Sequence, residues 1–394
     1  MKRFFKNKFV KWSLLLVVLI GSYITWYFTM RVPDYNLETL SINISQESYQ
    51  KLSSFRDVAL ENGLLERSDD DYVPAEIKYR SQIRMAEIRL KGDWTDHLRH
   101  KKWSFRIKMK ESMDDGLKIF SVQNLATRGY LKAYVFHQLL KQENVLTNEF
   151  RFIHVKVNEE SWGLYCLEEH LTDRMIANQG KDDGVILKFT DDPYFAVAQE
   201  KDAITDGLIK DAEIKTYGGG QNNSDQILDA KQIMLNYQFQ KGDPFIDFDS
   251  SITAKYYAIC DLATAYHAMG WINVRFYYNF NTEKMEPIGY DGYPELDWGK
   301  PFMGANFKSR NQNPFENIMI IYKALKNEGV YNEYMATLER ITHPNYVEKF
   351  MKKRKSELEF LENEIQKEYS SYEFDFNALS ARSNEIRAAM SQSN

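Results

Sequence analysis

Residues 273–291 read N-V-R-F-Y-Y-N-F-N-T-E-K-M-E-P-I-G-Y-D. The aromatic run at 276–278 favours an extended chain, the polar residues 279–284 supply a turn, and a second extended segment ends in G-Y-D-G at 289–292. A carboxylate at a strand end, here Asp291 with Asn273 upstream, is the arrangement that holds Mg²⁺ over nucleotide phosphates. A plain β-hairpin with a capping aspartate has the same sequence pattern. The rest of the chain has to decide between these two interpretations.

Two basic segments lie near residue 100. Residues 89–92 read R-L-K-G and residues 101–108 read K-K-W-S-F-R-I-K. Side chains alternate along a strand, so Arg106 and Lys108 share one face, opposite an apolar face. Together with Arg89 on a neighbouring strand they would present a cationic sheet face suited to a polyphosphate. The alternative is an ordinary solvated face.

Further blocks follow in order: N-E-E-S-W-G-L-Y-C-L-E-E-H at 158–170 and G-V-I-L-K-F at 184–189. With the basic segments and the late hairpin, this ordered set resembles the spore-coat CotH kinase-like family of atypical protein-kinase-like domains. The resemblance covers roughly residues 37–307. It implies an α+β, two-lobed kinase-like fold. It also implies an enzyme that transfers a phosphoryl group from ATP or another nucleotide bound with Mg²⁺.

The resemblance also implies roles for individual residues. The basic strand of the family corresponds to Lys102, Arg106 and Lys108, and the late lysine of its G-x-L-Y-K block to Lys188. Asp291 matches the metal-binding aspartate, and Asn273 matches the asparagine upstream of it. Asp297 is a second candidate metal contact, or a helix cap.

Glu169 closes the strand within the W-G-L-Y-C-L-E-E block. A buried glutamate at a strand end needs a cationic partner, and Lys188 or a lysine of the basic strands would serve. Such a pair is similar to the Lys–Glu pair of protein kinases. Its neighbour Glu168 is expected at the surface.

The chain departs from the family pattern before Asn273. The best-known members carry a candidate catalytic aspartate about nine residues upstream of that asparagine, where this chain has Thr264. The nearest substitutes are His267 and Asp261. A histidine serves as a general base near neutral pH, although a packing histidine is an equal alternative. The departure leaves two functions open: a phosphotransferase, or a catalytically inactive scaffold or binding module of the cell envelope.

The N-terminus predicts a membrane anchor. Five basic residues precede position 12, and residues 12–30 are apolar and uncharged. Nineteen helical residues span about 28 Å, close to the thickness of a bilayer core. The positive-inside rule keeps the N-terminus in the cytoplasm and exports the rest. We expect an anchor at residues 1–31, a kinase-like domain at 32–340, and a charged helix with a tail at 341–394. The location would be the cell membrane, and the acceptor an envelope protein or glycan.

Composition excludes other classes of protein. The 394-residue chain has a formal net charge of −5, which argues against a nucleic-acid partner. Its only cysteines, Cys166 and Cys260, form neither a disulfide framework nor a zinc site, and one bridge or two buried thiols remain open.

Periodicity predicts several further elements. We expect a helix at 46–62 with Ser45 as N-cap, a strand at 77–90, a helix at 130–143 and a charged helix at 346–369. The polar stretch 191–242 is interpreted as an exposed loop or insertion, and the last fifteen residues as frayed.

Overall fold

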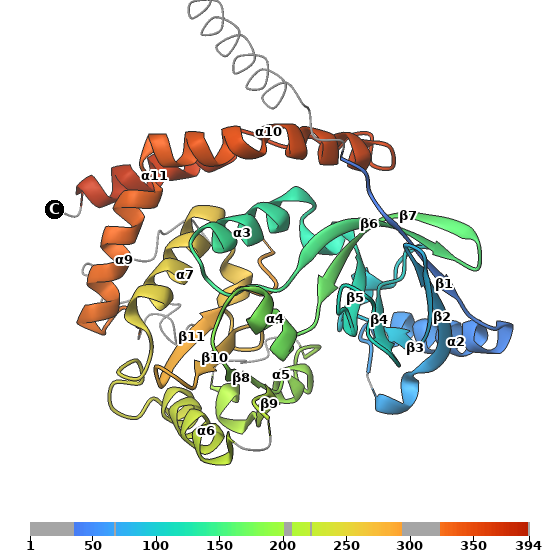
Figure 1. Cartoon of the computed structure of the whole chain (residues 1–394), viewed down its shortest axis with the longest axis horizontal. Coiled ribbons are helices and arrows are strands. Elements are labelled where there is room, and N and C mark those ends of the chain that lie inside the picture. Colours follow the sequence, from blue (N-terminus) through green and yellow to red (C-terminus); the bar gives the residue numbers. More distant parts are fainter. Residues whose placement is uncertain (1–34, 67, 201–206, 221–222, 294–323, 393–394) are drawn as a thin grey trace, which may run out of the picture.

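The computed structural model describes residues 35–66, 68–200, 207–220, 223–293 and 324–392, and every structural statement below concerns these residues. They form an α+β protein with two β-sheets (Figure 1). One sheet is a closed barrel, and the other is a four-stranded sheet surrounded by most of the helices. The mixed α+β class is therefore confirmed.

Seven strands close the barrel in the order β1-β2-β3-β4-β5-β7-β6. Their bounds are β1 (Thr39–Asn43), β2 (Val73–Tyr79), β3 (Gln82–Leu90), β4 (Phe105–Met109), β5 (Ile119–Asn124), β6 (Phe150–Val157) and β7 (Glu160–Glu169). Apolar residues recur at every second position and fill the interior, as Ile77, Ile88 and Phe105 do. The helix α2 (Gln46–Asn62) begins where the Ser45 hydroxyl accepts from the Ser48 amide, as predicted.

The expected strand at 77–90 is wrong in its length. The structure forms two antiparallel strands, β2 and β3, joined by a turn in which Arg80 has φ 55°. The turn contains no glycine or proline, so the local sequence gives no sign of it. Apolar and polar residues alternate along both strands, and this continuous alternation predicted a single strand at 77–90.

The second sheet has the order β11-β10-β8-β9, and all of its pairs are antiparallel. Its strands are β8 (Gly184–Phe189), β9 (Ile214–Gly218), β10 (Arg275–Asn279) and β11 (Lys284–Ile288). The predicted late hairpin is thus confirmed, with Tyr277 opposite Glu286. All five residues of β10 are buried, because β10 pairs on both sides and helices cover the sheet.

Helices of the same region are α3 (Leu131–Gln142), α4 (Asp173–Asn178), α5 (Asp192–Phe195), α6 (Ser224–Phe239), α7 (Ser250–Ala263), α9 (Glu328–Ile341), α10 (Pro344–Gln366) and α11 (Ala378–Gln392). The stretch 191–242, interpreted as an exposed loop, contains α5, β9 and α6. Met234 and Tyr237 of α6 are almost fully buried, and β9 is the edge strand beside β8. Tertiary packing overrides the polar composition here.

The C-terminal end is helical and packed, so the expectation of frayed residues is wrong. Ile386 of α11 is completely buried, and α11 contacts α7 and α10. Figure 1 shows α10 lying across α3 and reaching toward the barrel. Beyond its end, Glu368 accepts a hydrogen bond from the Leu164 amide of β7 at 2.5 Å. The tail therefore joins the barrel to the helical region.

The predicted anchor at residues 1–31 lies outside the described residues, as does Asp297. Among the residues that are described, no helix is both long and apolar enough to cross a membrane. Cys166 and Cys260 are both buried free thiols.

Candidate functional site

A cleft of about 740 Å³ collects side chains from both sheets. The barrel contributes Arg89 of β3 with Arg106 and Lys108 of β4, and the second sheet contributes Lys188 of β8 and Lys215 of β9. Arg89 and Arg106 are directly opposite one another across the strand pair. The predicted cationic sheet face is therefore present, and it faces two further lysines from the other sheet. Its acidic neighbours are Glu66, Asp69, Asp93, Asp191 and Asp192.

Two titratable groups in this cleft have shifted pKa values. Burial lowers the pKa of the Arg106 guanidinium, while among its neighbours Tyr290 and Glu168 raise it and Arg89 lowers it. Burial also holds the pKa of His170 well below its ordinary value, and the cations Arg106 and Lys91 add to that effect. Neighbouring cations thus disfavour a positive charge at His170. An anion bound in the cleft would relieve this repulsion.

Asp291 follows β11 in a loop where its own φ is 50°. Its Oδ1 lies 3.4 Å from Nη1 of Arg128, and its Oδ2 lies 3.6 Å from Nε2 of His267. Burial alone would raise the pKa of the Asp291 carboxyl, but Arg128 and His267 together hold it well below its usual range. Oδ1 is buried and accepts no hydrogen bond from any described residue. Asp291 is therefore an ionised carboxylate with spare acceptor capacity.

The two glycines beside Asp291 let its loop lie directly on helix α3. A Cβ atom at Gly289 would come within 2.0 Å of Cδ1 of Leu140, and one at Gly292 within 2.0 Å of Cδ1 of Phe136. Any larger residue would push the loop away from the helix. The glycines therefore fix the depth at which the carboxylate sits.

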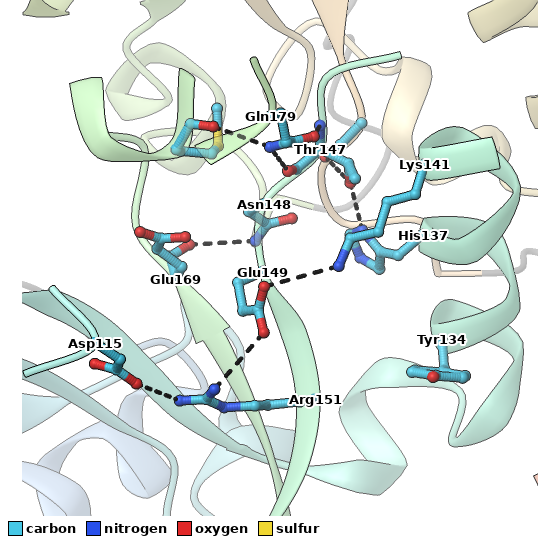
Figure 2. A network of polar contacts seen from close by, with 12 residues as sticks. Asp115, Tyr134, His137, Lys141, Thr147, Asn148, Glu149, Arg151, Glu169 and Gln179 are labelled. Carbon is cyan, nitrogen blue, oxygen red and sulfur yellow. Dashed lines mark hydrogen bonds and ion pairs between the residues drawn. The ribbon is translucent and has the colours of Figure 1, made fainter. Parts of the chain in front are cut away.

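Two polar residues, His137 of α3 and Thr147, also hold this loop, and Figure 2 shows how they lie. The Thr147 hydroxyl donates to the Gly289 carbonyl at 3.0 Å and pairs with Nδ1 of His137 at 2.6 Å. Since this hydroxyl has given its proton to Gly289, Nδ1 of His137 is the donor in that pair. Burial lowers the pKa of His137 to about 3, so the ring is neutral. His137 and Thr147 together fix the position of the backbone two residues before Asp291.

Thr147 belongs to the connection between α3 and β6, and Figure 2 shows how the connection is fixed. Gln179, the C-cap of α4, accepts from the Thr147 amide at 3.1 Å and donates to the Thr147 carbonyl at 2.6 Å. Glu149 lies between Lys141 and Arg151 at ion-pair distances of 3.8 and 3.7 Å. The segment linking the barrel to the helical region is therefore held rigidly beside the Asp291 loop.

The structure does not bring Lys102 to the cleft. Its amine pairs with the Glu368 carboxylate and lies over the rings of Tyr165 and Tyr369, at 5.4 and 5.3 Å from their centroids. Lys102 precedes β4 and faces the end of α10, whereas Arg106 and Lys108 within the strand face the cleft. Its contacts are those of a residue that holds the C-terminal segment.

The two glutamates at the end of β7 differ from expectation. Glu169 is buried and has a cationic partner, as predicted, but the partner is Arg174 of α4 rather than a lysine. Glu168 was expected at the surface and is only 3% exposed. It accepts from the Gln123 amide, and its Oε2 lies 3.9 Å from Nε of Arg128. Both faces of β7 are covered at this end, so strand alternation could not show that Glu168 is buried.

The two candidate bases lie in different surroundings. Asp261 is completely buried in α7, and its two carboxylate oxygens accept from the hydroxyls of Tyr266 and Tyr334. His267 instead lies beside Asp291, and its backbone carbonyl accepts from Nδ2 of Asn273 at 3.0 Å. The structure thus places His267 beside Asp291 and bonds Asn273 to the backbone of His267, and it ties Asp261 into the core.

The sequence reasoning missed three residues of this region: Arg128, His170 and Lys215. Arg128 follows β5 in the segment N-L-A-T-R-G-Y, where it is the one charged residue between a strand and a helix. That isolation was the available signal. Lys215 lies in the stretch that was interpreted as a loop, and His170 directly follows Glu169.

The site offers partial support for a magnesium ion. The buried Oδ1 of Asp291, which accepts no hydrogen bond from any described residue, is a suitable ligand atom. The described part of the chain contains no group of three or more His, Cys, Asp or Glu side chains that could hold a metal ion, either at this site or at any other. Mg²⁺ commonly binds one or two protein groups and takes its other oxygens from phosphates and water. The residues therefore fit a metal that arrives with a phosphate ligand.

A comparison with known proteins identifies a family for this chain. The sequence model described as CotH kinase protein matches residues 88–390, from β3 through α11. No curated protein matches the chain. The match covers most of the chain, including the C-terminal helices that lie beyond the resemblance noted from the sequence blocks. The chain belongs to the CotH kinase protein family.

Proposed function

We propose that this protein is a membrane-anchored atypical kinase. It moves a phosphoryl group from a nucleotide–Mg²⁺ complex, such as ATP–Mg²⁺, to a hydroxyl of an envelope protein or glycan. The observation that carries the proposal is the cleft in which cations from two different sheets face one another. In this proposal the barrel and the helical region are the two lobes of a kinase-like fold, with the nucleotide between them.

Each residue of the site has a part in this proposal. Arg106, Lys108 and Lys188 bind the phosphates, since charged donors to phosphate make strong hydrogen bonds. Asp291 and Asn273 hold Mg²⁺, which neutralises phosphate charge when it is bound. Family membership supports a kinase-like protein, and the cleft and the carboxylate are what support these roles.

His267 is the proposed general base. Its side chain is 33% exposed, so an acceptor hydroxyl can approach it, and Asp291 lies 3.6 Å from its Nε2. A carboxylate at that distance stabilises the imidazolium that forms when the histidine takes a proton. Asp261 is not available for this step, because two tyrosine hydroxyls occupy its oxygens.

One observation favours a second function. Thr264, at the position where the best-known relatives carry an aspartate, is the C-cap of α7 with φ 54°. It supplies no carboxylate, so the chain would bind a nucleotide without transferring phosphate if His267 is not a base. The protein would then be a scaffold or binding module of the cell envelope.

The binding experiment uses the full-length chain in detergent and calorimetry with ATP and Mg²⁺. Asp291→Asn should abolish Mg²⁺-dependent nucleotide binding while the protein stays folded. Asp57→Asn, at an exposed position in α2, is the control and should bind as wild type does. Unchanged binding by Asp291→Asn would remove this carboxylate from the site.

The transfer experiment offers labelled ATP with hydroxyl-bearing envelope fractions. His267→Ala should lower turnover by about 10²–10⁴ and spare nucleotide affinity. Wild-type protein that binds nucleotide but labels no acceptor would replace the kinase proposal with the scaffold.

The anchor is tested separately. A reporter that is active only in the cytoplasm, fused after Asn394, should stay silent, because the N-terminal charges keep that end inside. An active reporter would contradict the exported location.

A further inference from the structure

Arg128 lies where the barrel connects to the helical region. It is the last residue of the 3₁₀ turn Leu125–Arg128, between β5 and α3, and Gly129 follows it with φ 63°. The residue is only 5% exposed. Its Nη1 donates to the Thr127 carbonyl at 2.8 Å, and its Nη2 donates to Oε1 of Gln123 at 2.5 Å. The guanidinium is thus held in place by neutral groups of its own segment.

Two carboxylates share this one guanidinium. Asp291 approaches Nη1 at 3.4 Å, and Glu168 approaches Nε at 3.9 Å. Neither contact is a hydrogen bond. Nε of Arg128, Oε1 of Glu168 and Oδ1 of Asp291 are all buried without a hydrogen-bond partner among the described residues. Buried charges are ordinarily hydrogen-bonded as well as paired, so this cluster is incompletely satisfied.

Arg128 therefore compensates Asp291 and Glu168 through charge and not through a hydrogen bond, and one oxygen of each carboxylate accepts no hydrogen bond from the described residues. A carboxylate with full bidentate bonds to arginine would have little left to offer another cation. Asp291 keeps its Oδ1 lone pairs, but the positive charge beside them repels any second cation. A bare Mg²⁺ ion at Oδ1 would meet the guanidinium at close range in a buried site.

Nucleotide phosphates change this balance. They bring several negative charges to a cleft lined by Arg106, which lies opposite Ser121 of β5, and Ser121 lies opposite Glu168, the partner of Arg128. The added negative charge stabilises the metal and the guanidinium together. A metal ion could then bind Asp291 beside Arg128. Without the phosphates, the positive charge of Arg128 would repel that ion.

We propose that Arg128 is the resident counter-cation of Asp291, which excludes a bare divalent ion and admits the metal only together with a nucleotide. This inference rests on the proposed function, because it assigns the metal to Asp291. It makes Arg128 a specificity residue for the metal–nucleotide complex.

The test is calorimetric titration of the full-length chain with Mg²⁺ alone, and then with Mg²⁺ in the presence of ATP. Wild type should show no Mg²⁺ binding at millimolar concentrations without ATP, and clear binding with it. Arg128→Met should bind Mg²⁺ alone at least tenfold more tightly than wild type. Its melting temperature without metal should fall, because two buried carboxylates lose their cation, and Mg²⁺ should restore part of the loss.

Two further variants isolate the cause. Arg275→Met removes another buried arginine, one that lies over the Tyr290 ring at 4.8 Å and donates to backbone carbonyls, and it should leave Mg²⁺ binding as in wild type. Arg128→Lys keeps the charge and should still exclude bare Mg²⁺, which separates charge from packing. If Arg128→Met does not fold, Arg128→Gln takes its place with the same expected result.

The outcomes distinguish this inference from the proposed function. Tight binding of Mg²⁺ alone by wild type, or no gain in Arg128→Met over both wild type and Arg275→Met, overturns the role of Arg128. Absence of nucleotide binding by wild type contradicts the proposed function instead. In that case a gain of Mg²⁺ binding by Arg128→Met would still support the pairing with Asp291.

Discussion

Asp261 and Asp291 are two buried carboxylates with opposite surroundings. Asp261 lies within helix α7 and is completely buried, and the hydroxyls of Tyr266 and Tyr334 donate to its two oxygens. Arg382 of α11 adds bonds to the Asp261 carbonyl at 3.0 Å and to the Tyr266 hydroxyl at 2.7 Å. Asp291 sits on a loop with positive φ, and its nearest basic groups, Arg128 and His267, lie at 3.4 and 3.6 Å.

The difference in hydrogen bonding distinguishes a carboxylate with a structural role, Asp261, from one that can bind a ligand, Asp291. Fixed donors fill the acceptor capacity of Asp261, so its charge stabilises the packing of α7 against α9 and α11. Asp291 is compensated by charge and keeps a buried oxygen without a hydrogen bond from the described residues. A buried ionised group that is incompletely satisfied is a candidate for binding. The following predictions test this contrast, from the largest expected effect to the smallest.

Asp261→Ala should lower the free energy of unfolding by about 3–5 kcal/mol, because two buried tyrosine hydroxyls lose their acceptor and Arg382 loses a neighbouring negative charge. Urea unfolding followed by circular dichroism measures the change. Asp291→Ala is the matched variant and should lose less than half as much, since Arg128 keeps Glu168 as a partner. Equal losses would break the contrast between the two carboxylates.

Arg106→Met and Lys108→Met, made separately, should each weaken ATP–Mg²⁺ binding by about 1.5–3 kcal/mol, tenfold or more, because each loses a charged contact to phosphate. Calorimetry gives the affinity, and unfolding should change little. Lys78→Met, at an exposed position on β2, is the control. Wild-type affinity in both cleft variants would make the cationic face an ordinary solvated one.

Stability should depend on pH through His137, which helps to hold the Asp291 loop. Its pKa is lowered to about 3 in the folded protein, chiefly by burial, with Lys141 adding to the effect. The unfolded chain therefore binds a proton that the folded chain refuses. The contribution of the neutral His137 ring to the free energy of unfolding is complete above about pH 6.5. It is lost as pH falls from there toward 3, by about 1.4 kcal/mol per pH unit.

His137→Gln should flatten that slope when urea unfolding is compared between pH 7 and pH 5. The depressed pKa of His170 acts in the same direction and remains in the variant, so part of the slope should persist. His100→Gln, in an exposed loop, should keep the wild-type slope. An unchanged slope in His137→Gln would show that His137 does not titrate as a buried neutral ring.

Thr147→Val should cost about 1 kcal/mol of stability, because the Gly289 carbonyl and Nδ1 of His137 lose their partner. It should also weaken ATP–Mg²⁺ binding, since the loop that carries Asp291 loses one of its supports. Thr253→Val is a matched control, because the buried Thr253 hydroxyl has no hydrogen-bond partner in the described part of the chain. That variant should be neutral or slightly stabilising. A larger loss in Thr253→Val than in Thr147→Val would contradict the support of the loop by Thr147.

Local patterns predicted much of the fold. The hairpin of β10 and β11 and helices α2, α3 and α10 follow from spacing and capping alone. Alternation also placed Arg106 and Lys108 on one face of β4. Such features depend on periods of two or 3.6 residues, which the sequence carries by itself.

Local patterns failed where distant segments decide the outcome. The region 191–242 folds because β8 accepts β9 as a neighbour, and α11 is ordered because it packs on α7 and α10. Neither partner is visible in the local sequence. The turn at Arg80 was missed because it uses no turn-specific residue.

The candidate site divides in the same way. The sequence by itself determined which residues can bind a phosphate or a metal, because their chemistry and their strand faces are local properties. Only the tertiary structure decided their partners. It moved Lys102 to Glu368, paired Glu169 with Arg174, tied Asp261 to tyrosines and placed Arg128 between Glu168 and Asp291. Charge pairing depends on distances across the fold, and no spacing along the chain fixes those distances.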